Sequence, residues 1–182
     1  MSFHPCVVLP CYNHGYALEA ILADISAHNL PVLIVNDGST DETSAIIETL
    51  LTRYPHAAAL HRPCNGGKGA AVRDGLVWAS ERGFSHALFL DSDGQHTTAD
   101  IPRFLESARL APQSIIVGRP WFGSEAPLSR RLGREVSNVF VALVTATVSV
   151  RDVLCGFRVY PLALVRARIP LERLQPRMGF DV

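Results

Sequence analysis

Short apolar segments alternate with amphipathic segments along the first two thirds of the chain. Segments with the length and composition of buried strands lie at residues 6–10, 32–35, 57–61, 86–90 and 114–118. Segments with helical spacing of apolar residues lie between them, at residues 17–27, 40–51, 68–82 and 98–110. This alternation predicts an α/β fold, in which helices cover both faces of a mostly parallel sheet and form a three-layer α/β/α sandwich.

The first two helices have the clearest apolar faces. The first face consists of Leu18, Ile21, Leu22 and Ile25, and the second of Ile46, Ile47, Leu50 and Leu51. Ser39 or Thr40 is predicted to cap the second helix, because a hydroxyl can accept a hydrogen bond from a backbone N–H group at a helix start. After residue 119 the alternation weakens. A Pro-, Gly- and Ser-rich stretch at 120–129 precedes a long helix predicted at 131–147, and residues 151–160 are predicted to hold one or two short strands.

Composition limits the class of protein. A chain of 182 residues is long enough for one substantial core, and 48% hydrophobic with 19% charged residues is a globular composition. Basic and acidic residues balance at 17 each, so no overall field favours nucleic acid. Neither a secretory signal nor an apolar run of about 20 residues is present, so we expect a cytoplasmic protein. The sequence fixes no oligomeric state.

The four cysteines, at positions 6, 11, 64 and 155, show no metal-binding or redox spacing. We therefore expect buried or half-buried thiols in a reducing compartment.

Polar clusters follow three of the predicted strands directly. They are Pro10-Cys11-Tyr12-Asn13, Asn36-Asp37-Gly38-Ser39 and Asp91-Ser92-Asp93-Gly94-Gln95. Ligands of open parallel sheets bind beyond the carboxyl ends of the strands. The three clusters are therefore predicted to form one site.

The third cluster has the composition of a divalent-cation site. Asp91, Asp93 and Gln95 alternate along the chain and offer the hard oxygen ligands that Mg²⁺ or Mn²⁺ prefers. An Asp-Gly turn without a metal is the alternative. In the other two clusters, Asp37 could bind a ribose or a base edge or only shape a loop, and Tyr12 could stack on a base or only pack at an edge.

Basic groups suited to phosphate occur at two further places. The loop Asn65-Gly66-Gly67-Lys68-Gly69 would let the backbone approach a phosphate, with Lys68 supplying charge, although the loop lacks the Ser or Thr of a P-loop. Arg119 directly follows the fifth predicted strand, so it would lie at the edge of the sheet where ligands are expected to bind. Arg130, Arg131 and Arg134 form either a phosphate-binding group or a solvated helix face.

Together these motifs resemble the family 2 glycosyltransferases of GT-A fold, the nucleotide-diphospho-sugar transferase type. The matching segments span nearly the whole chain and occur in order, at residues 8–13, 35–41, 65–71, 90–96, 117–119 and 152–158. They are most similar to the dolichol- or polyprenyl-phosphate mannosyltransferase branch. Within that branch, the segment Cys-Gly-Phe-Arg-Val-Tyr-Pro, at residues 155–161, resembles the sequence of bacterial members associated with lipid pathways.

The resemblance implies a role for each matching position. Residues lining the nucleotide pocket would be Pro10, Tyr12, Asn13, Val35, Asp37 and Lys68. Asp91 and Ser92 would lie against the ribose and diphosphate, and Asp93 and Gln95 would hold Mg²⁺ or Mn²⁺, so that Asp93 serves catalysis. Arg119 and Arg131 would bind the acceptor or its phosphate.

The implied reaction transfers a sugar, with inversion, from a UDP- or GDP-sugar to a lipid or glycan acceptor. An anionic lipid phosphate needs no strong general base, whereas a hydroxyl acceptor would need one, for which Asp152 is the candidate. The branch also implies peripheral contact with the cytoplasmic face of the inner membrane.

Three features depart from the family pattern. His14 stands where many members carry an acid, and Asn36 replaces the first acid of the usual Asp-Asp pair. The chain ends at Val182, where relatives continue. We therefore expect residues 1–182 to form a single glycosyltransferase domain truncated at its C-terminus.

Two other classes remain as alternatives. A haloacid-dehalogenase-like phosphatase also carries an Asp-x-Asp motif after a strand, and would use Asp91 as its nucleophile. A non-catalytic nucleotide-binding module would keep the pocket without the reaction.

Overall fold

A computed structural model of the chain describes residues 2–94, 98–118 and 155–168. Its elements, in chain order, are β1 (Pro5–Cys11), α1 (Gly15–Ser26), β2 (Val32–Asn36), α2 (Thr43–Arg53), β3 (Ala57–His61), α3 (Lys68–Glu81), β4 (His86–Phe89), η1 (Thr98–Asp100), α4 (Ile101–Leu110), β5 (Ile116–Val117), β6 (Arg158–Pro161) and α6 (Leu162–Arg168). The predicted alternation of strands and helices is confirmed. The long helix predicted at 131–147 lies outside the described residues.

The strands of the described residues form one six-stranded sheet in the order β3-β2-β1-β4-β6-β5. Strands β1 to β4 pair in parallel, whereas β6 runs antiparallel to both β4 and β5. The sheet is therefore mostly parallel, as predicted. Cys11 pairs with Asn36, and Asn36 with His61, so the carboxyl ends of β1, β2 and β3 lie at one edge of the sheet.

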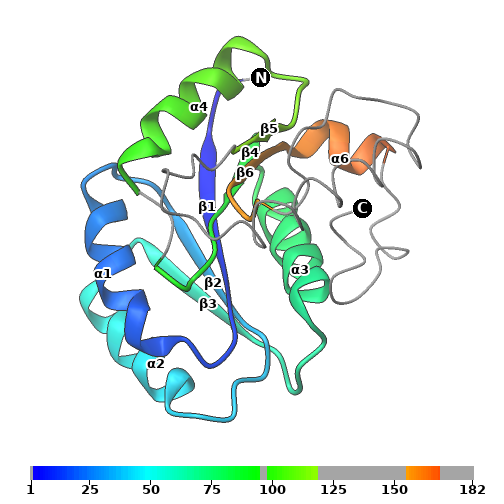
Figure 1. Cartoon of the computed structure of the whole chain (residues 1–182). Coiled ribbons are helices and arrows are strands. Elements are labelled where there is room, and N and C mark those ends of the chain that lie inside the picture. The colour runs from blue at the N-terminus through cyan, green and yellow to red at the C-terminus, as the bar shows by residue number, and fades with distance from the viewer. Residues whose placement is uncertain (1, 95–97, 119–154, 169–182) are drawn as a thin grey trace, which may run out of the picture.

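Alternating side chains of the strands face two different helix layers. Val7 and Leu9 of β1 belong to a buried cluster shared with α1, α2 and α4, whereas Cys6 and Val8 belong to a second cluster shared with α3 and α6. Figure 1 shows the two helix groups on opposite sides of the sheet. The predicted three-layer sandwich is confirmed.

The predicted helix faces are confirmed in α1 and largely in α2. All four predicted residues of α1 are buried. In α2, Ile47 and Leu50 are buried, while Ile46 and Leu51 are partly buried and pack against the same cluster.

The predicted cap of α2 is wrong. The N-cap residue is Glu42, whose side chain makes no capping hydrogen bond, and Asp41 Oδ1 accepts the backbone N–H of Thr43 at 3.0 Å. The Ser39 hydroxyl instead accepts a hydrogen bond from the Asn13 backbone N–H, and the Thr40 hydroxyl accepts one from the Asn13 side chain. Because both hydroxyls serve the neighbouring loop, neither reaches the start of the helix.

Two predicted elements differ at their bounds. Residues 98–100 form a separate 3₁₀ turn before α4, and the predicted strand at 114–118 shortens to Ile116–Val117. Three cysteines are buried as expected, but Cys64 is exposed, because it lies in the loop between β3 and α3. Among the described helices, none combines the length and apolar character needed to cross a membrane.

Gly75 of α3 packs directly on the sheet, and we predict that Gly75→Ala destabilises the fold. A Cβ atom there would lie 2.6 Å from Val8 Cγ1 and 3.3 Å from Phe89 Cε1. Overpacking costs about 1–3 kcal/mol, which exceeds the gain of about 1 kcal/mol from replacing a helical glycine with alanine. Urea unfolding would measure the difference.

The double variant Gly75→Ala/Val8→Ala is the control for this prediction. Since Val8→Ala removes the colliding methyl group, the double variant should lose less stability than the sum of the single variants. Additive losses would contradict the proposed collision.

Candidate functional site

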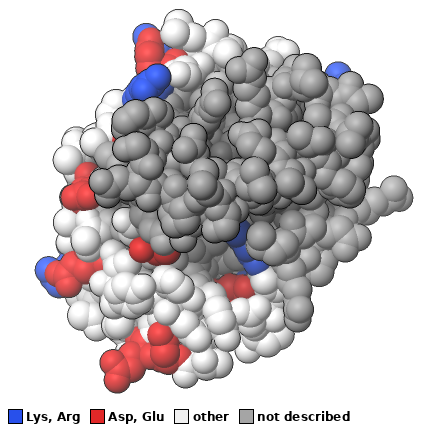
Figure 2. Space-filling model, viewed as in Figure 1, with Lys and Arg blue, Asp and Glu red and all other residues white. Residues whose placement is uncertain are grey.

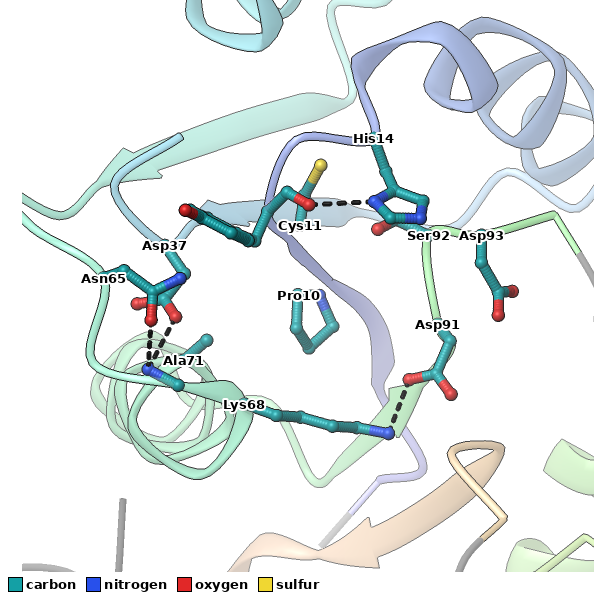
Figure 3. Close-up of a pocket in the computed structure, with 12 residues that line it drawn as sticks. Pro10, Cys11, His14, Asp37, Asn65, Lys68, Ala71, Asp91, Ser92 and Asp93 are labelled. Atoms are coloured by element: carbon teal, nitrogen blue, oxygen red, sulfur yellow. Dashed lines mark hydrogen bonds and ion pairs between the residues drawn. The ribbon is translucent and has the colours of Figure 1, made fainter. Parts of the chain in front are cut away.

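A cavity of about 400 Å³ opens beyond the carboxyl ends of β1, β2 and β4. This volume lies within the range of small-molecule sites. Figure 3 shows the lining residues, which are Pro10, Cys11, Tyr12, His14, Asp37, Asn65, Gly67, Lys68, Ala71, Asp91, Ser92 and Asp93. The structure thus brings the three predicted polar clusters and the predicted phosphate loop together around one cavity.

The loop after β1 supplies an aromatic wall. Tyr12 is 41% exposed, so its ring is accessible from the cavity. His14 Nδ1 donates a hydrogen bond of 2.8 Å to the Tyr12 carbonyl oxygen, because a carbonyl can only accept. The His14 ring also stacks on Tyr16, with a centroid separation of 5.7 Å. This wall offers flat surfaces of the kind on which a nucleobase can stack.

Two residues predicted to bind a nucleotide do not line the cavity. The side-chain oxygen of Asn13 accepts a hydrogen bond from the Thr40 backbone N–H at 2.9 Å, so Asn13 joins the loops that follow β1 and β2. Val35 is fully buried and belongs to the core cluster shared with α3. Both residues lie behind those that line the cavity, and their contact with a nucleotide stays a prediction.

Asp37 holds the loop that precedes α3. Its carboxylate is buried and accepts hydrogen bonds from the backbone N–H groups of Gly66 and Gly67, at 3.0 and 2.8 Å. It also forms an ion pair with Arg62, whose Nε donates to Asp74 Oδ2 at 2.8 Å. A buried carboxylate is tolerated when it is paired and hydrogen bonded in this way. Asp37 lines the cavity, and its predicted contact with a ribose or base stays a prediction.

Asn36 replaces the first acid of the Asp-Asp pair that is usual in the resembling family. It is buried, and its side chain forms hydrogen bonds with other groups of the protein. Its amide nitrogen contacts Ser44 Oγ at 2.8 Å and His61 Nδ1 at 3.0 Å, and its oxygen accepts the Ser39 backbone N–H at 3.0 Å. Asn36 therefore shapes the loop after β2.

Lys68 and Asp91 form an ion pair across the floor of the cavity. Lys68 Nζ lies 2.8 Å from Asp91 Oδ1, and Figure 3 shows the lysine stem extending from the start of α3 to the end of β4. On the side of β6, Gly156 approaches Asp91 so closely that a Cβ atom on Gly156 would collide with the carboxylate. The position of Asp91 is therefore narrowly defined by two other segments of the chain.

The loop after β4 turns immediately after its second acid. Ser92 is buried, Asp93 lines the cavity, and Gly94 has a φ of +74°, which glycine adopts without strain. The described residues contain no cluster of three or more His, Cys, Asp or Glu side chains that could hold a metal. Two carboxylates on one loop instead fit a Mg²⁺ or Mn²⁺ ion that completes its shell with phosphate oxygens and water.

Cys11 contributes an uncharged wall. Burial raises the pKa of its thiol, although a hydrogen bond with Ser92 acts in the opposite direction. The thiol is therefore neutral near pH 7 and is a poor nucleophile. The lining residues Cys11, His14 and Ala71 have no role predicted from the sequence. For Ala71 a signal existed, because it lies one helical turn after Lys68 on the same face of α3.

Four predicted site residues lie outside the described residues: Gln95, Arg119, Arg131 and Asp152. Their predicted roles stay predictions.

On the face in Figure 2, acidic and basic side chains of the described residues are interspersed among uncharged ones. Within the described site, the Lys68–Asp91 pair places opposite charges 2.8 Å apart.

Several proteins with similar sequences are named as sugar transferases of polyprenyl or dolichyl phosphates. An undecaprenyl-phosphate mannosyltransferase of Micrococcus luteus is 29% identical over 180 residues, covering 96% of this chain and 73% of that protein. A polyprenol monophosphomannose synthase of Mycolicibacterium smegmatis is 27% identical over 168 residues, covering 85% of this chain but 60% of that protein. The predicted similarity to this branch is confirmed.

Solved structures of glycosyltransferases share the fold. A mannosyltransferase of Pyrobaculum calidifontis, in complex with GDP-Man and Mn²⁺, has a TM-score of 0.63 at 14% identity and covers 90% of this chain and 46% of that one. TarS of S. aureus, in complex with UDP, has a TM-score of 0.59 at 20% identity and covers 98% and 52%. The GT-A fold is confirmed.

The family model described as "Glycosyl transferase family 2" matches residues 6–168, which is most of the chain. The match includes β1, the Asp91-Ser92-Asp93 loop and β6, so it covers the whole described site. The phosphatase alternative is therefore wrong, and the chain belongs to glycosyl transferase family 2.

Proposed function

We propose that the chain transfers a sugar from a nucleoside-diphosphate sugar to a polyprenyl phosphate or another lipid-linked acceptor, with inversion at the anomeric carbon. The observation that carries the proposal is the composition of the cavity. It combines an aromatic wall at Tyr12, a glycine loop with Lys68, and two carboxylates at Asp91 and Asp93. These are the groups needed for the base, the diphosphate and a divalent cation.

The donor would lie along the edge of the sheet. Its base would stack near Pro10 and Tyr12, and its diphosphate would lie between Lys68 and the loop after β4. Gly67 and Lys68, at the N-terminus of α3, line the cavity, and the positive end of the helix dipole would favour a phosphate there. Asp37, paired with Arg62, accepts the backbone N–H groups of Gly66 and Gly67 and would thereby hold the loop that positions Lys68 for the diphosphate.

In the proposed reaction, an oxygen of the acceptor phosphate attacks the anomeric carbon as the bond to the nucleoside diphosphate breaks. Asp91, Asp93 and Gln95 would hold the cation, and Arg119 and Arg131 would bind the acceptor phosphate. When bound, Mg²⁺ or Mn²⁺ would neutralise the charge that builds on the departing diphosphate. An anionic acceptor needs no strong base, and Asp152 would serve as the base for a hydroxyl acceptor.

The relatives support the choice of acceptor, because their names specify undecaprenyl phosphate and polyprenol. Such acceptors reside in membranes, so we propose that the protein works at the cytoplasmic face of the inner membrane. Residues 1–182 would form the glycosyltransferase domain.

The first test is a transfer assay. We expect release of UDP or GDP from the matching sugar nucleotide when polyprenyl phosphate and Mn²⁺ are both supplied, with Asp93→Asn slowing release by about 100- to 1000-fold. Glu106→Gln, which changes an exposed acid on α4, is the matched control and should keep the wild-type rate. Nucleotide binding without any turnover would identify a non-catalytic binding module instead.

A second prediction concerns the donor base. In a thermal-shift panel of UDP, GDP, CDP and ADP, one nucleotide should stabilise the protein in the presence of Mn²⁺, by about 2.7 kcal/mol at 100 times its dissociation constant. Asp93→Asn should lose the Mn²⁺-dependent part of this stabilisation. Equal stabilisation with and without Mn²⁺ would argue against a cation bridge between Asp93 and the diphosphate.

A third prediction concerns the support of the glycine loop. Arg62→Met should destabilise the protein by about 3 kcal/mol, because Asp37 would stay buried without its cation. It should also weaken nucleotide binding, since the Gly66–Gly67 backbone loses its anchor. Denaturant unfolding and nucleotide titration would measure the two effects.

Arg53→Met provides the comparison for Arg62→Met. Arg53 pairs with Glu19 on the surface, and the side chains are 53% and 55% exposed. Its loss should therefore cost less than about 1 kcal/mol and leave nucleotide binding unchanged. Similar losses for the two variants would refute the anchoring role of Arg62.

A further inference from the structure

Lys68 is the one lysine among the 17 lysine and arginine residues of this chain. It is also the first residue of α3 and lines the cavity. Lysine differs from arginine in carrying a compact charge on a flexible stem, which can change partners without a fixed planar geometry. The position in the cavity thus carries the more mobile of the two basic side chains.

A cation at this position is electrostatically unfavourable on its own. Cations are destabilising at the positive end of a helix dipole, and α3 has no acidic residue in its first turn. The carboxylate of Asp37, which accepts the Gly67 backbone N–H at the start of α3, is already paired with Arg62. Asp91 offsets this cost from across the cavity, where its Oδ1 atom lies 2.8 Å from Lys68 Nζ. Lys68 therefore depends on an anion outside its own helix.

The two partners differ in their freedom to move. The Asp91 carboxylate lies directly against Gly156, at a separation that leaves no room for a Cβ atom. The Lys68 side chain is 31% exposed and extends along the floor of the open cavity. A change of partner would therefore move the ammonium group and leave the carboxylate in place.

We propose that Lys68 is a resident counter-ion, which neutralises Asp91 in the ligand-free site and transfers to the diphosphate of the donor when Asp91 takes up a divalent cation. This inference rests on the proposed function. The exchange couples the two ligands: a cation alone must displace Lys68, whereas a diphosphate gives the displaced ammonium group a new anion. By linkage, each ligand then strengthens the binding of the other.

The single lysine permits a direct test by NMR. Protein labelled with ¹³C only in lysine gives one set of side-chain signals, all from Lys68, and Asp91→Asn supplies the reference position for an ammonium group that has lost this carboxylate. Saturation is verified on the same samples by thermal shift, with Mg²⁺ as the diamagnetic cation.

We expect Mg²⁺ to move the Lys68 signal toward its position in Asp91→Asn, and the nucleoside diphosphate to move it again to a third position. If the nucleotide with Mg²⁺ stabilises the protein while the Lys68 signal stays unchanged, the counter-ion role is wrong and the proposed function stands. If no nucleotide stabilises the wild-type protein, both fail together.

Cation affinity gives an independent measurement by calorimetry with Mn²⁺ alone. Lys68→Met removes the competing charge, so Mn²⁺ should bind about three- to fivefold more tightly than to the wild type. Lys68→Arg keeps the charge and should show no such gain. With Mn²⁺ saturating, Lys68→Met should bind the nucleoside diphosphate more weakly. Mn²⁺ affinity that is unchanged or lower in Lys68→Met would overturn the proposal.

Discussion

Parallel pairing of β1 with both β2 and β4 is the constraint on which the site depends. Because these three strands run in the same direction, the segments that follow them emerge at one edge of the sheet. The aromatic wall, the buried Asp37 and the Asp91–Asp93 loop come from segments up to about 80 residues apart in sequence, and only this pairing brings them together. The two helix layers serve mainly to bury the strands that maintain it.

The sequence was informative where local pattern determines structure. Apolar runs located the strands to within a few residues, and the polar clusters that end them located the cavity. It was uninformative where distant side chains compete for the same groups. Ser39 and Thr40 have the chemistry of helix caps, but Asn13, 26 residues from Ser39, occupies their hydroxyls. No local pattern reveals such a competitor.

The role of Asp37 shows the same limit within the site. Its position at the end of β2 indicated a ligand contact, but its oxygens also bind Arg62 and the backbone of the glycine loop. A buried carboxylate needs such partners, and which residues supply them depends on the packing of β3 and α3 against β2. The sequence could thus identify the cavity more readily than it could separate the residues that line it from those that hold its walls.

The position of β6 between β4 and β5 has a consequence for synthesis of the chain. A ribosome releases β1 to β4 well before residues 158–161, so the first four strands can pair while the outer edge of β4 is still open. Within the described strands, β5 pairs with β6 and must wait for it. The nascent chain therefore passes through a stage with an unpaired strand edge, the kind of surface that chaperones protect from aggregation.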